Sequence, residues 1–272
     1  MKSSRLDFRG KVALVSGAGS GIGRALALQL AERGAALALI DIRAETLAET
    51  VAALPAGHDV STHALDVASR EAVAALPAAI LARHPAVDLL FNNAGVAVAG
   101  AFTETREADF DWLFEINFHA VVRMTRAFLP HLLTRPDAHI VNTASIFGII
   151  APAGQTHYSA SKFAVRGFSD ALRHELEDTN VGISVVCPGG VATSIAHSAR
   201  FAEHFSKEEV RGRLAKADRL LRLPPAEAAR VILAGVERRR PRIVVGTDAR
   251  LAYFIERLAP IGYWKLLRSI TS

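Results

Sequence analysis

The sequence predicts an α/β fold with a doubly wound central parallel sheet of about seven strands and helices on both faces. Short apolar segments with few polar interruptions, typical of strands covered on both faces, alternate with helical segments along the whole chain. Such alternation implies parallel strands joined by right-handed crossovers. A glycine-rich turn, Gly17–Gly23, follows the first apolar segment and opens the first helix. Together these features predict a Rossmann-type domain.

The predicted strands share apolar or β-branched residues and a short length. Polar or turn-forming residues follow several of them. The predicted strands are Lys11–Ser16, Ala36–Ile40, Val60–Leu65, Val87–Phe91, His139–Thr143, Ile183–Cys187 and Arg242–Val245.

Helical spacing of Ala, Leu and Val marks the segments between these strands. A long helix over Asp109–Leu133 is expected to bend near Asn117, and Ser194–Leu223 is expected to be an insertion with short helices. The other predicted helices are Arg24–Arg33, Glu45–Leu54, Arg70–Arg83, His157–Asp178 and Pro225–Glu237.

Length and composition suit one globular domain over residues 1–272, since half of the residues are hydrophobic and 22% are charged. The net charge of +5 is spread along the chain. The densest basic run, Arg238–Arg240, lacks the interleaved aromatic residues that stack on bases, so we interpret it as a solvated helix end and expect no nucleic-acid partner.

The sequence also predicts a cytoplasmic protein. Cys187 is the only cysteine, which excludes an intrachain disulfide and a multi-cysteine metal site. The segment Met1–Gly10 is polar and lacks the apolar core of a signal peptide. No apolar run reaches the length of a membrane span.

Tyr158 and Lys162 are the candidate catalytic pair. Residues at positions i and i+4 of a helix lie on one face. A cation beside a phenol favours the phenolate and lowers the phenol's pKa, so the pair predicts a general acid/base that works near neutral pH. Ser145 ends the run Val141–Ser145, where its hydroxyl is expected to hold a substrate oxygen against the phenol.

A dinucleotide site is predicted around the glycine-rich turn. Gly17, Gly21 and Gly23 allow a tight turn and close approach of the backbone to a pyrophosphate. Asp41, at the end of the second strand, is placed to bond a ribose 2′-hydroxyl and to repel a 2′-phosphate, which favours NAD over NADP. Arg43 is a competing candidate ligand for that phosphate. Asp66 is a candidate for the adenine, or alternatively the N-cap of the next helix.

Several ordered motifs resemble those of the short-chain dehydrogenase/reductase family, in its shorter single-domain branch. The resemblance covers about residues 8–246. Its motifs are Ser16–Gly23, where the family usually begins with Thr, then Asn92–Gly95, Asn117, Ser145, Tyr158–Lys162, and Pro188-Gly189 with Thr193.

The resemblance implies a role for each motif. Tyr158 is the general acid/base, Lys162 lowers its pKa and contacts the nicotinamide ribose, Ser145 holds the substrate oxygen, and Asn117 fixes a water that connects Lys162 to solvent. No metal is needed. The expected cofactor-binding residues are Gly17, Ser20, Gly21, Ile22, Gly23, Asp41, Arg43, Asp66, Val67, Asn93, Ala94, Gly95, Tyr158, Lys162, Pro188, Gly189, Val191 and Thr193.

Substrate contacts are expected from Ser145, Phe147, Gln155 and Tyr158, and from a substrate loop over residues 194–224. The apolar residues of this loop suit a lipophilic substrate under a mobile lid; a helix hairpin packed on its own domain explains them equally well. Two neighbours are interpreted as structural: His157 as a packing residue and Cys187 as a small core residue.

The C-terminal extension, residues 248–272, places apolar residues at near-helical spacing among basic ones. Packing on the domain or on a sister subunit is the preferred interpretation. The alternatives are that it lies on a membrane surface or covers the substrate pocket.

The resulting prediction is an oxidoreductase that transfers a hydride between NAD and a secondary alcohol or ketone. The apolar residues of the substrate loop favour a hydrophobic substrate. The alternatives are an NADP-linked carbonyl reductase and a catalytically silent NAD-binding regulatory protein. By resemblance, a homodimer or homotetramer is expected through the helices over Asp109–Leu133 and His157–Asp178.

Overall fold

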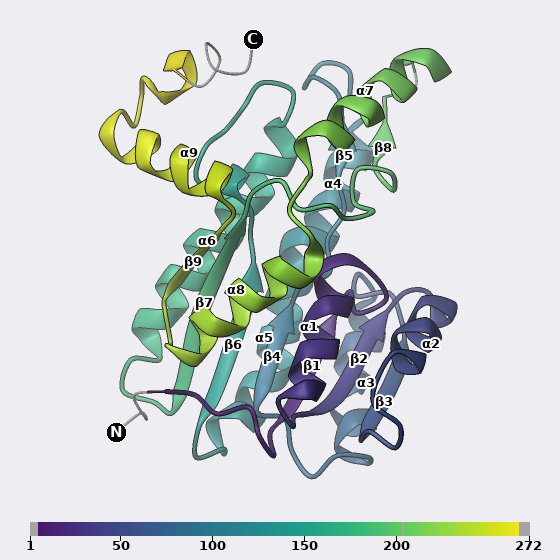
Figure 1. Ribbon diagram of the computed structural model, residues 1–272, viewed down its shortest axis with the longest axis vertical. Coiled ribbons are helices and arrows are strands. Elements are labelled where there is room, and N and C mark those ends of the chain that lie inside the picture. The colour runs from purple at the N-terminus through teal and green to yellow at the C-terminus, as the bar shows by residue number, and fades with distance from the viewer. Residues whose placement is uncertain (1–4, 203, 267–272) are drawn as a thin grey trace.

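Within residues 5–202 and 204–266, which a computed structural model describes, seven parallel strands form one sheet (Figure 1). The strand order is β3-β2-β1-β4-β6-β7-β9, which confirms the doubly wound prediction. The strands are β1 (Val12–Ser16), β2 (Ala36–Asp41), β3 (Val60–Ala64), β4 (Leu89–Asn92), β6 (Ala138–Thr143), β7 (Val181–Pro188) and β9 (Arg242–Val245).

Helices cover both faces of the sheet (Figure 1). Successive strand residues point to opposite faces, so Val15 packs in the core beneath α1, α2 and α8, whereas Leu14 packs in the core beneath α3, α5 and α6. The helices are α1 (Gly21–Glu32), α2 (Ala44–Ala52), α3 (Arg70–Leu81), α5 (Ala120–Leu133), α6 (Thr156–Glu175) and α8 (Pro225–Glu237).

The helix expected to bend near Asn117 contains a π-helical segment at that point. Helix α4 (Glu107–Phe114) continues through η1 (Glu115–His119), which is π-helical, into α5. Such insertions change the direction and hydrogen bonding of a helix locally and are frequent at functional sites. Asn117 itself is fully buried.

The substrate loop differs from the expectation of short helices. It holds one helix of 14 residues, α7 (Lys207–Leu220), which begins at a capping box of Ser206 and Glu209. Helix α7 buries none of its side chains, so its sequence lacks the apolar periodicity that identifies helices. The loop also contains β8 (Arg200–Phe201), which pairs in parallel with β5 (Val98–Ala99); two-residue strands carry no recognisable pattern.

Two further elements lie at the carboxyl edge of the sheet. The 3-10 helix η2 (Ile146–Gly148) follows β6, and α9 (Thr247–Leu258) follows β9. Helices α7 and α9 stand at the same end of the molecule (Figure 1). In the described part of the chain, none of the helices combines the length and hydropathy needed to span a membrane.

Candidate active site

The predicted catalytic residues come together beyond the carboxyl end of β6. Ser145 is the N-cap of η2, and its Oγ accepts a hydrogen bond of 3.1 Å from the Phe147 amide. Tyr158 lies in the first turn of α6, and a hydrogen bond links its phenol to the Ser145 hydroxyl. The ring of Phe147 meets the ring of Tyr158 edge to face, with centroids 6.2 Å apart. Ser145 and Phe147 therefore fix the orientation of the phenol.

Lys162 lies one helical turn after Tyr158 and is 3% exposed. Its Nζ donates a hydrogen bond of 3.1 Å to the carbonyl of Thr143 and stands 5.6 Å from the centroid of the Tyr158 ring. Burial penalises the charged ammonium and lowers the pKa of Lys162 to about 8. The Lys162 side chain therefore loses its positive charge at a pH that is only slightly above neutral.

The predicted direction of the Tyr158 pKa is wrong for this state of the protein. The side chain is half-buried as a whole, but its phenol group lies deep enough that burial raises the pKa above the ordinary value of 10.0. The hydrogen bond from Ser145 opposes this rise without overcoming it. The spacing of Tyr158 and Lys162 reveals the nearby charge but not the cost of burying a phenolate.

Asn117 connects the segment after β4 to α6. Its Oδ1 accepts from the Val96 amide at 2.8 Å, and its Nδ2 donates to the Val96 carbonyl at 3.0 Å and to Ser161 Oγ at 3.3 Å. These bonds use both Nδ2 protons. The side chain thus holds two elements of the site together, while its predicted role in binding a water stays a prediction.

The glycine-rich turn has the geometry predicted for pyrophosphate binding. Gly17 and Gly21 have φ of +67° and +52°, a region that side chains disfavour. A Cβ on Gly23 would lie 2.0 Å from the Gly17 carbonyl oxygen. Thr193 faces the turn, since a Cβ on Gly21 would lie 3.0 Å from Thr193 Cγ2. The turn and the segment after β7 therefore approach each other, as a shared ligand requires.

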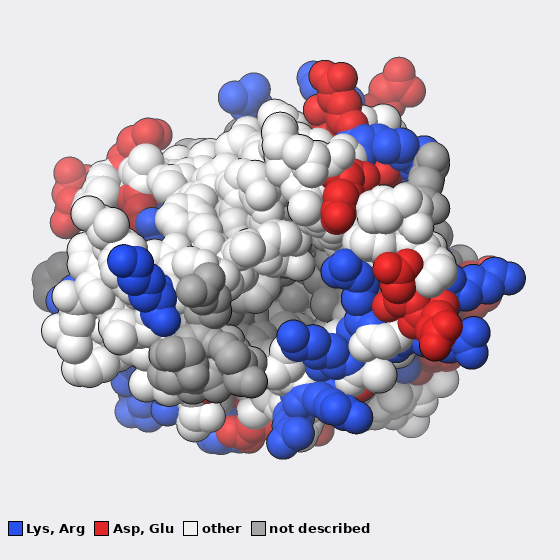
Figure 2. All heavy atoms as spheres, turned by 90° about the horizontal axis from the view of Figure 1, so that it is seen from above, with Lys and Arg blue, Asp and Glu red and all other residues white. Residues whose placement is uncertain are grey.

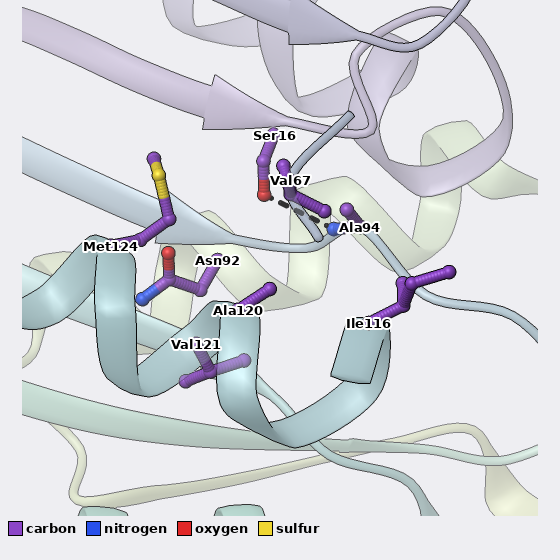
Figure 3. A pocket seen from close by; sticks show the side chains of 8 residues that line it. All are labelled: Ser16, Val67, Asn92, Ala94, Ile116, Ala120, Val121 and Met124. Carbon is purple, nitrogen blue, oxygen red and sulfur yellow. Dashed lines mark hydrogen bonds between the residues drawn. The ribbon is translucent and has the colours of Figure 1, made fainter. Parts of the chain in front are cut away.

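Ser16 binds the Asn-Asn-Ala-Gly segment to the turn, a role that sequence analysis missed. Its Oγ accepts from the amides of Asn93 at 3.0 Å and Ala94 at 3.1 Å, and it donates to the Phe91 carbonyl at 3.3 Å. The bond to Ala94 is drawn in Figure 3. The hydroxyl that opens the glycine motif is the signal that could have revealed this role.

A small cavity lies behind this segment (Figure 3). Its volume of about 10 Å³ leaves room for one water at most, so it is too small for a cofactor or substrate. Its lining residues are Ser16, Val67, Asn92, Ala94, Ile116, Ala120, Val121 and Met124. Val67, a predicted cofactor residue, is buried against this inner wall.

Asp41 lies beside the glycine-rich turn, as predicted. Its Oδ2 accepts from the Gly19 amide at 2.9 Å and its Oδ1 from the Arg43 amide at 3.2 Å. The Arg43 side chain is exposed. Arg24 bonds to protein groups instead: its Nη2 donates to the Gly19 carbonyl and to Glu49 Oε2, each at 2.6 Å.

Asp66 does not cap the following helix, so that alternative is wrong. Its Oδ1 accepts from the Ala68 amide at 2.8 Å, whereas Ser69 is the N-cap of α3 and accepts from the Ala72 amide at 3.2 Å. Its Oδ1 therefore supports the turn after β3. The contact of Asp66 with adenine stays a prediction.

The segment after β7 is held by α9. The Gly190 amide donates to Asp248 Oδ2 at 2.7 Å, and a Cβ on Gly189 would lie 2.3 Å from the same carboxylate. Val191 is buried and forms an isolated parallel bridge with Leu223, which closes the base of the substrate loop. Ser20 Oγ lies 3.4 Å from Ser194 Oγ, where the loop meets the glycine-rich turn.

The remaining predicted residues lie nearby. Ile22 is half-buried in the first turn of α1, Gln155 is the half-buried N-cap of α6, and Pro188 ends β7. A Cβ on Gly95 would lie 3.2 Å from Asn117 Oδ1 and 3.5 Å from Lys162 Nζ.

Two residues interpreted as structural are buried. His157 Nε2 hydrogen-bonds to the Val98 carbonyl at 2.8 Å. Burial raises the pKa of the Cys187 thiol to about 12, which disfavours a thiolate nucleophile. Over the described residues, no group of three or more His, Cys, Asp or Glu is arranged to hold a metal.

The donor set fits a dinucleotide cofactor. Gly17 and Gly23 leave a cradle that a Cβ would fill, and the amides of the turn lie at the N-terminus of α1. Asp41 stands at the end of the neighbouring strand, where a carboxylate that binds the ribose is expected.

Comparisons with known proteins agree with this geometry. Residues 11–204 match the sequence model of the short chain dehydrogenase family. "Putative oxidoreductase SadH" of Mycobacterium tuberculosis is 42% identical over 265 residues, which cover 96% of this chain and 95% of SadH.

Solved structures give the same result. A short chain dehydrogenase/reductase from Burkholderia phymatum in complex with NAD has a TM-score of 0.83 and 35% identity, covering 93% of this chain and 95% of its own. A metagenomic short-chain oxidoreductase in complex with NADP has a TM-score of 0.69 and 29% identity, covering 88% and 98%.

Proposed function

The chain belongs to the short-chain dehydrogenase/reductase family, and we propose that it transfers a hydride between NAD and a secondary alcohol or ketone. It is an oxidoreductase whose relatives bind NAD or NADP. The observation that carries the proposal is the arrangement of Ser145, Tyr158 and Lys162 around one point beyond β6.

Tyr158 is proposed as the general acid/base. With its pKa raised by burial, the phenol keeps its proton and is ready to donate it to a ketone oxygen. In alcohol oxidation it must instead accept the hydroxyl proton, and a protonated Lys162 one turn away favours the phenolate that does so. A nicotinamide cofactor, when bound, supplies or accepts the hydride.

Ser145 is proposed to hold the substrate oxygen. Its hydroxyl already bonds to the Tyr158 phenol, so an oxygen that reaches the phenol also lies near this donor. A hydrogen bond from Ser145 stabilises negative charge as it develops on that oxygen. Phe147 and Gln155 complete the substrate side of the proposed site.

NAD is the proposed cofactor. The Asp41 carboxylate is held toward the glycine-rich turn by the Gly19 amide, where it accepts from a ribose hydroxyl and repels a 2′-phosphate. Arg24, another basic residue near the turn, is paired with Glu49. The runner-up, an NADP-linked carbonyl reductase, requires the exposed Arg43 to outweigh Asp41.

We further propose one domain over residues 1–272, a cytoplasmic homodimer or homotetramer, and a lipophilic substrate under the loop of residues 194–224. A catalytically silent NAD-binding regulatory protein is the alternative from another functional class. The complete Ser145, Tyr158 and Lys162 set argues against it, because a sensor has no need of a general acid/base.

Thermal unfolding with NAD and with NADP at matched concentration tests the cofactor proposal, since selective binding to the folded state raises the melting temperature. A larger rise with NAD supports Asp41 as the ribose ligand. A larger rise with NADP overturns that assignment. If neither cofactor raises the melting temperature, the oxidoreductase proposal as a whole is overturned.

A further inference from the structure

The C-terminal segment exposes a row of large apolar side chains. In α9 and the residues after it, exposure ranges from 50% for Leu266 to 96% for Ile261. Residues three, four or seven apart on a helix share a face, so the members within α9 form one stripe. This C-terminal apolar patch consists of Leu251, Phe254, Leu258, Ile261 and Leu266.

The orientation of the patch is set by contacts on the opposite side of the segment. Ala249 and Ala252 are buried in the core cluster beside η2. Asp248 Oδ2 accepts from the Gly190 amide at 2.7 Å, and the Tyr263 hydroxyl accepts from the Ala151 amide at 2.8 Å. Tyr253 of α9 also packs, partly buried, against this cluster, so the preferred interpretation of packing on the domain explains one side of the helix but not the exposed stripe.

The charges around the patch select a partner. Arg250, Arg257 and Lys265 are exposed beside the apolar side chains, whereas Glu256 is half-buried. With three basic residues and one acid, the segment 249–266 has a net charge of +2. In a two-fold contact between two such patches the basic residues would outnumber the acidic ones, because Glu256 is the one acid of the segment 249–266. An anionic lipid surface satisfies both the apolar stripe and its basic flank.

The segment that carries the patch contacts the surroundings of the candidate active site on its other side. Asp248 holds Gly190, which follows the proposed cofactor residues Pro188 and Gly189. Tyr263 holds Ala151, on the segment that joins Ser145 to α6. The end of the molecule that carries α7 and α9 is seen from above in Figure 2, where a broad area without charged side chains lies beside a hollow, and both basic and acidic side chains lie on one side of that hollow.

We propose that the C-terminal apolar patch docks on the surface of an anionic lipid bilayer, and that the substrate is a secondary alcohol or ketone dissolved in that bilayer. Docking turns the site toward the lipid, so an apolar substrate reaches Tyr158 without crossing water. The docking rests on the patch alone, whereas the substrate class also rests on the proposed function.

Flotation of the full chain with vesicles tests the docking. Vesicles of phosphatidylcholine mixed with phosphatidylglycerol should carry the protein upward, and vesicles of phosphatidylcholine alone should carry much less. The variant Phe254→Ser/Leu258→Ser should lose at least roughly tenfold in vesicle partitioning, because membrane affinity follows the buried apolar area. Both side chains are exposed, so their replacement leaves the core intact.

Leu133→Ser is the matched control, since Leu133 is an exposed apolar residue at the end of α5; it should float like the wild type. Arg250→Gln/Arg257→Gln should weaken binding to the anionic vesicles and make it less sensitive to salt. Wild-type protein that stays at the bottom with anionic vesicles overturns the docking, as does full flotation of Phe254→Ser/Leu258→Ser. A fall in the oligomer mass of Phe254→Ser/Leu258→Ser, together with no flotation of the wild type, would also overturn the docking.

Kinetics separate the docking from the proposed function. Tyr158→Phe should float as the wild type does, whether or not it turns over substrate. For a long-chain secondary alcohol in anionic vesicles, Phe254→Ser/Leu258→Ser should raise KM, with KM for a short water-soluble alcohol unchanged. Equal KM values for wild type and variant in vesicles overturn the substrate class, and inactivity of the wild type on both alcohols contradicts the proposed function instead.

Discussion

Arg200 in β8 donates a hydrogen bond of 2.9 Å to the buried carboxylate of Asp109 in α4. The same guanidinium lies 3.6 Å from the centre of the Trp112 ring. Hydrogen bonds from Arg106 and then from Arg200 hold the pKa of Asp109 below its usual range, despite its burial. The start of the substrate loop is therefore fixed to the body of the protein, although α7 buries no side chain.

Replacing Arg200 should loosen the substrate loop. Arg200→Met removes a charge-assisted hydrogen bond and the contact with Trp112, with an expected loss of about 1–2 kcal/mol of stability because Arg200 is partly exposed. Subtilisin, a protease of broad specificity, should then cleave within α7 faster, and KM should rise more than kcat falls. Arg211→Met is the control, because Arg211 bonds only to the Lys207 carbonyl of its own helix among its described contacts. Unchanged cleavage in Arg200→Met would contradict this role.

Replacing glycine by alanine should have opposite effects at Gly23, in the glycine-rich turn, and at Gly212, in α7. Gly23→Ala places a Cβ 2.0 Å from a backbone oxygen, so it should abolish NAD binding or destabilise the fold. Gly212→Ala, in α7, meets no atom within 4 Å and should stabilise that helix by about 0.5–1 kcal/mol. Isothermal titration with NAD and urea unfolding measure both effects. Normal NAD affinity in Gly23→Ala would contradict the assigned site.

The buried Lys162 predicts a pH dependence of stability. Folding lowers its pKa from 10.5 to about 8, so the buried ammonium destabilises the folded state below pH 8. This destabilisation disappears as the pH rises toward 10.5. Relative to Lys162→Met, the wild type should gain up to about 3 kcal/mol between pH 7 and pH 10. Urea unfolding of both proteins measures the difference. A constant difference across that range would exclude the lowered pKa.

Asp41 should decide between the two cofactors. Asp41→Asn keeps an oxygen that can accept from the Gly19 amide but removes the charge that repels a 2′-phosphate. The Kd for NADP should fall, and the Kd for NAD should rise by roughly tenfold, since a hydrogen bond to a charged group contributes about 1.5–3 kcal/mol. Fluorescence titration with each cofactor measures both. If the ratio of the two Kd values does not change, Asp41 is not the ribose ligand.

Most of the fold followed from local patterns in the sequence. Strands such as β1 and β4 are buried on both faces and therefore show as apolar runs, and the turn at Gly17–Gly23 marks where the first strand ends. Parallel strands place Ser145 and Asp41 at one edge, so their location could be predicted without coordinates.

The features that escaped prediction depend on packing. Helix α7 has no buried face and hence no periodicity, and the Asp109–Arg200 bond joins residues 91 apart in the chain. The direction of the Tyr158 pKa depends on the burial of its phenol, which the spacing of Tyr158 and Lys162 does not reveal. The sequence patterns thus predicted which side chains meet at the site, but not how deeply those side chains are buried away from water.

The central claim is that Tyr158 moves the proton while the protein binds the cofactor independently. Steady-state turnover and NAD titration of Tyr158→Phe test it most directly, in protein shown to be folded. The account predicts that kcat falls by roughly 100- to 10,000-fold, the usual contribution of general acid/base catalysis, while the Kd for NAD stays near the wild-type value. Turnover close to wild type in Tyr158→Phe would contradict the account.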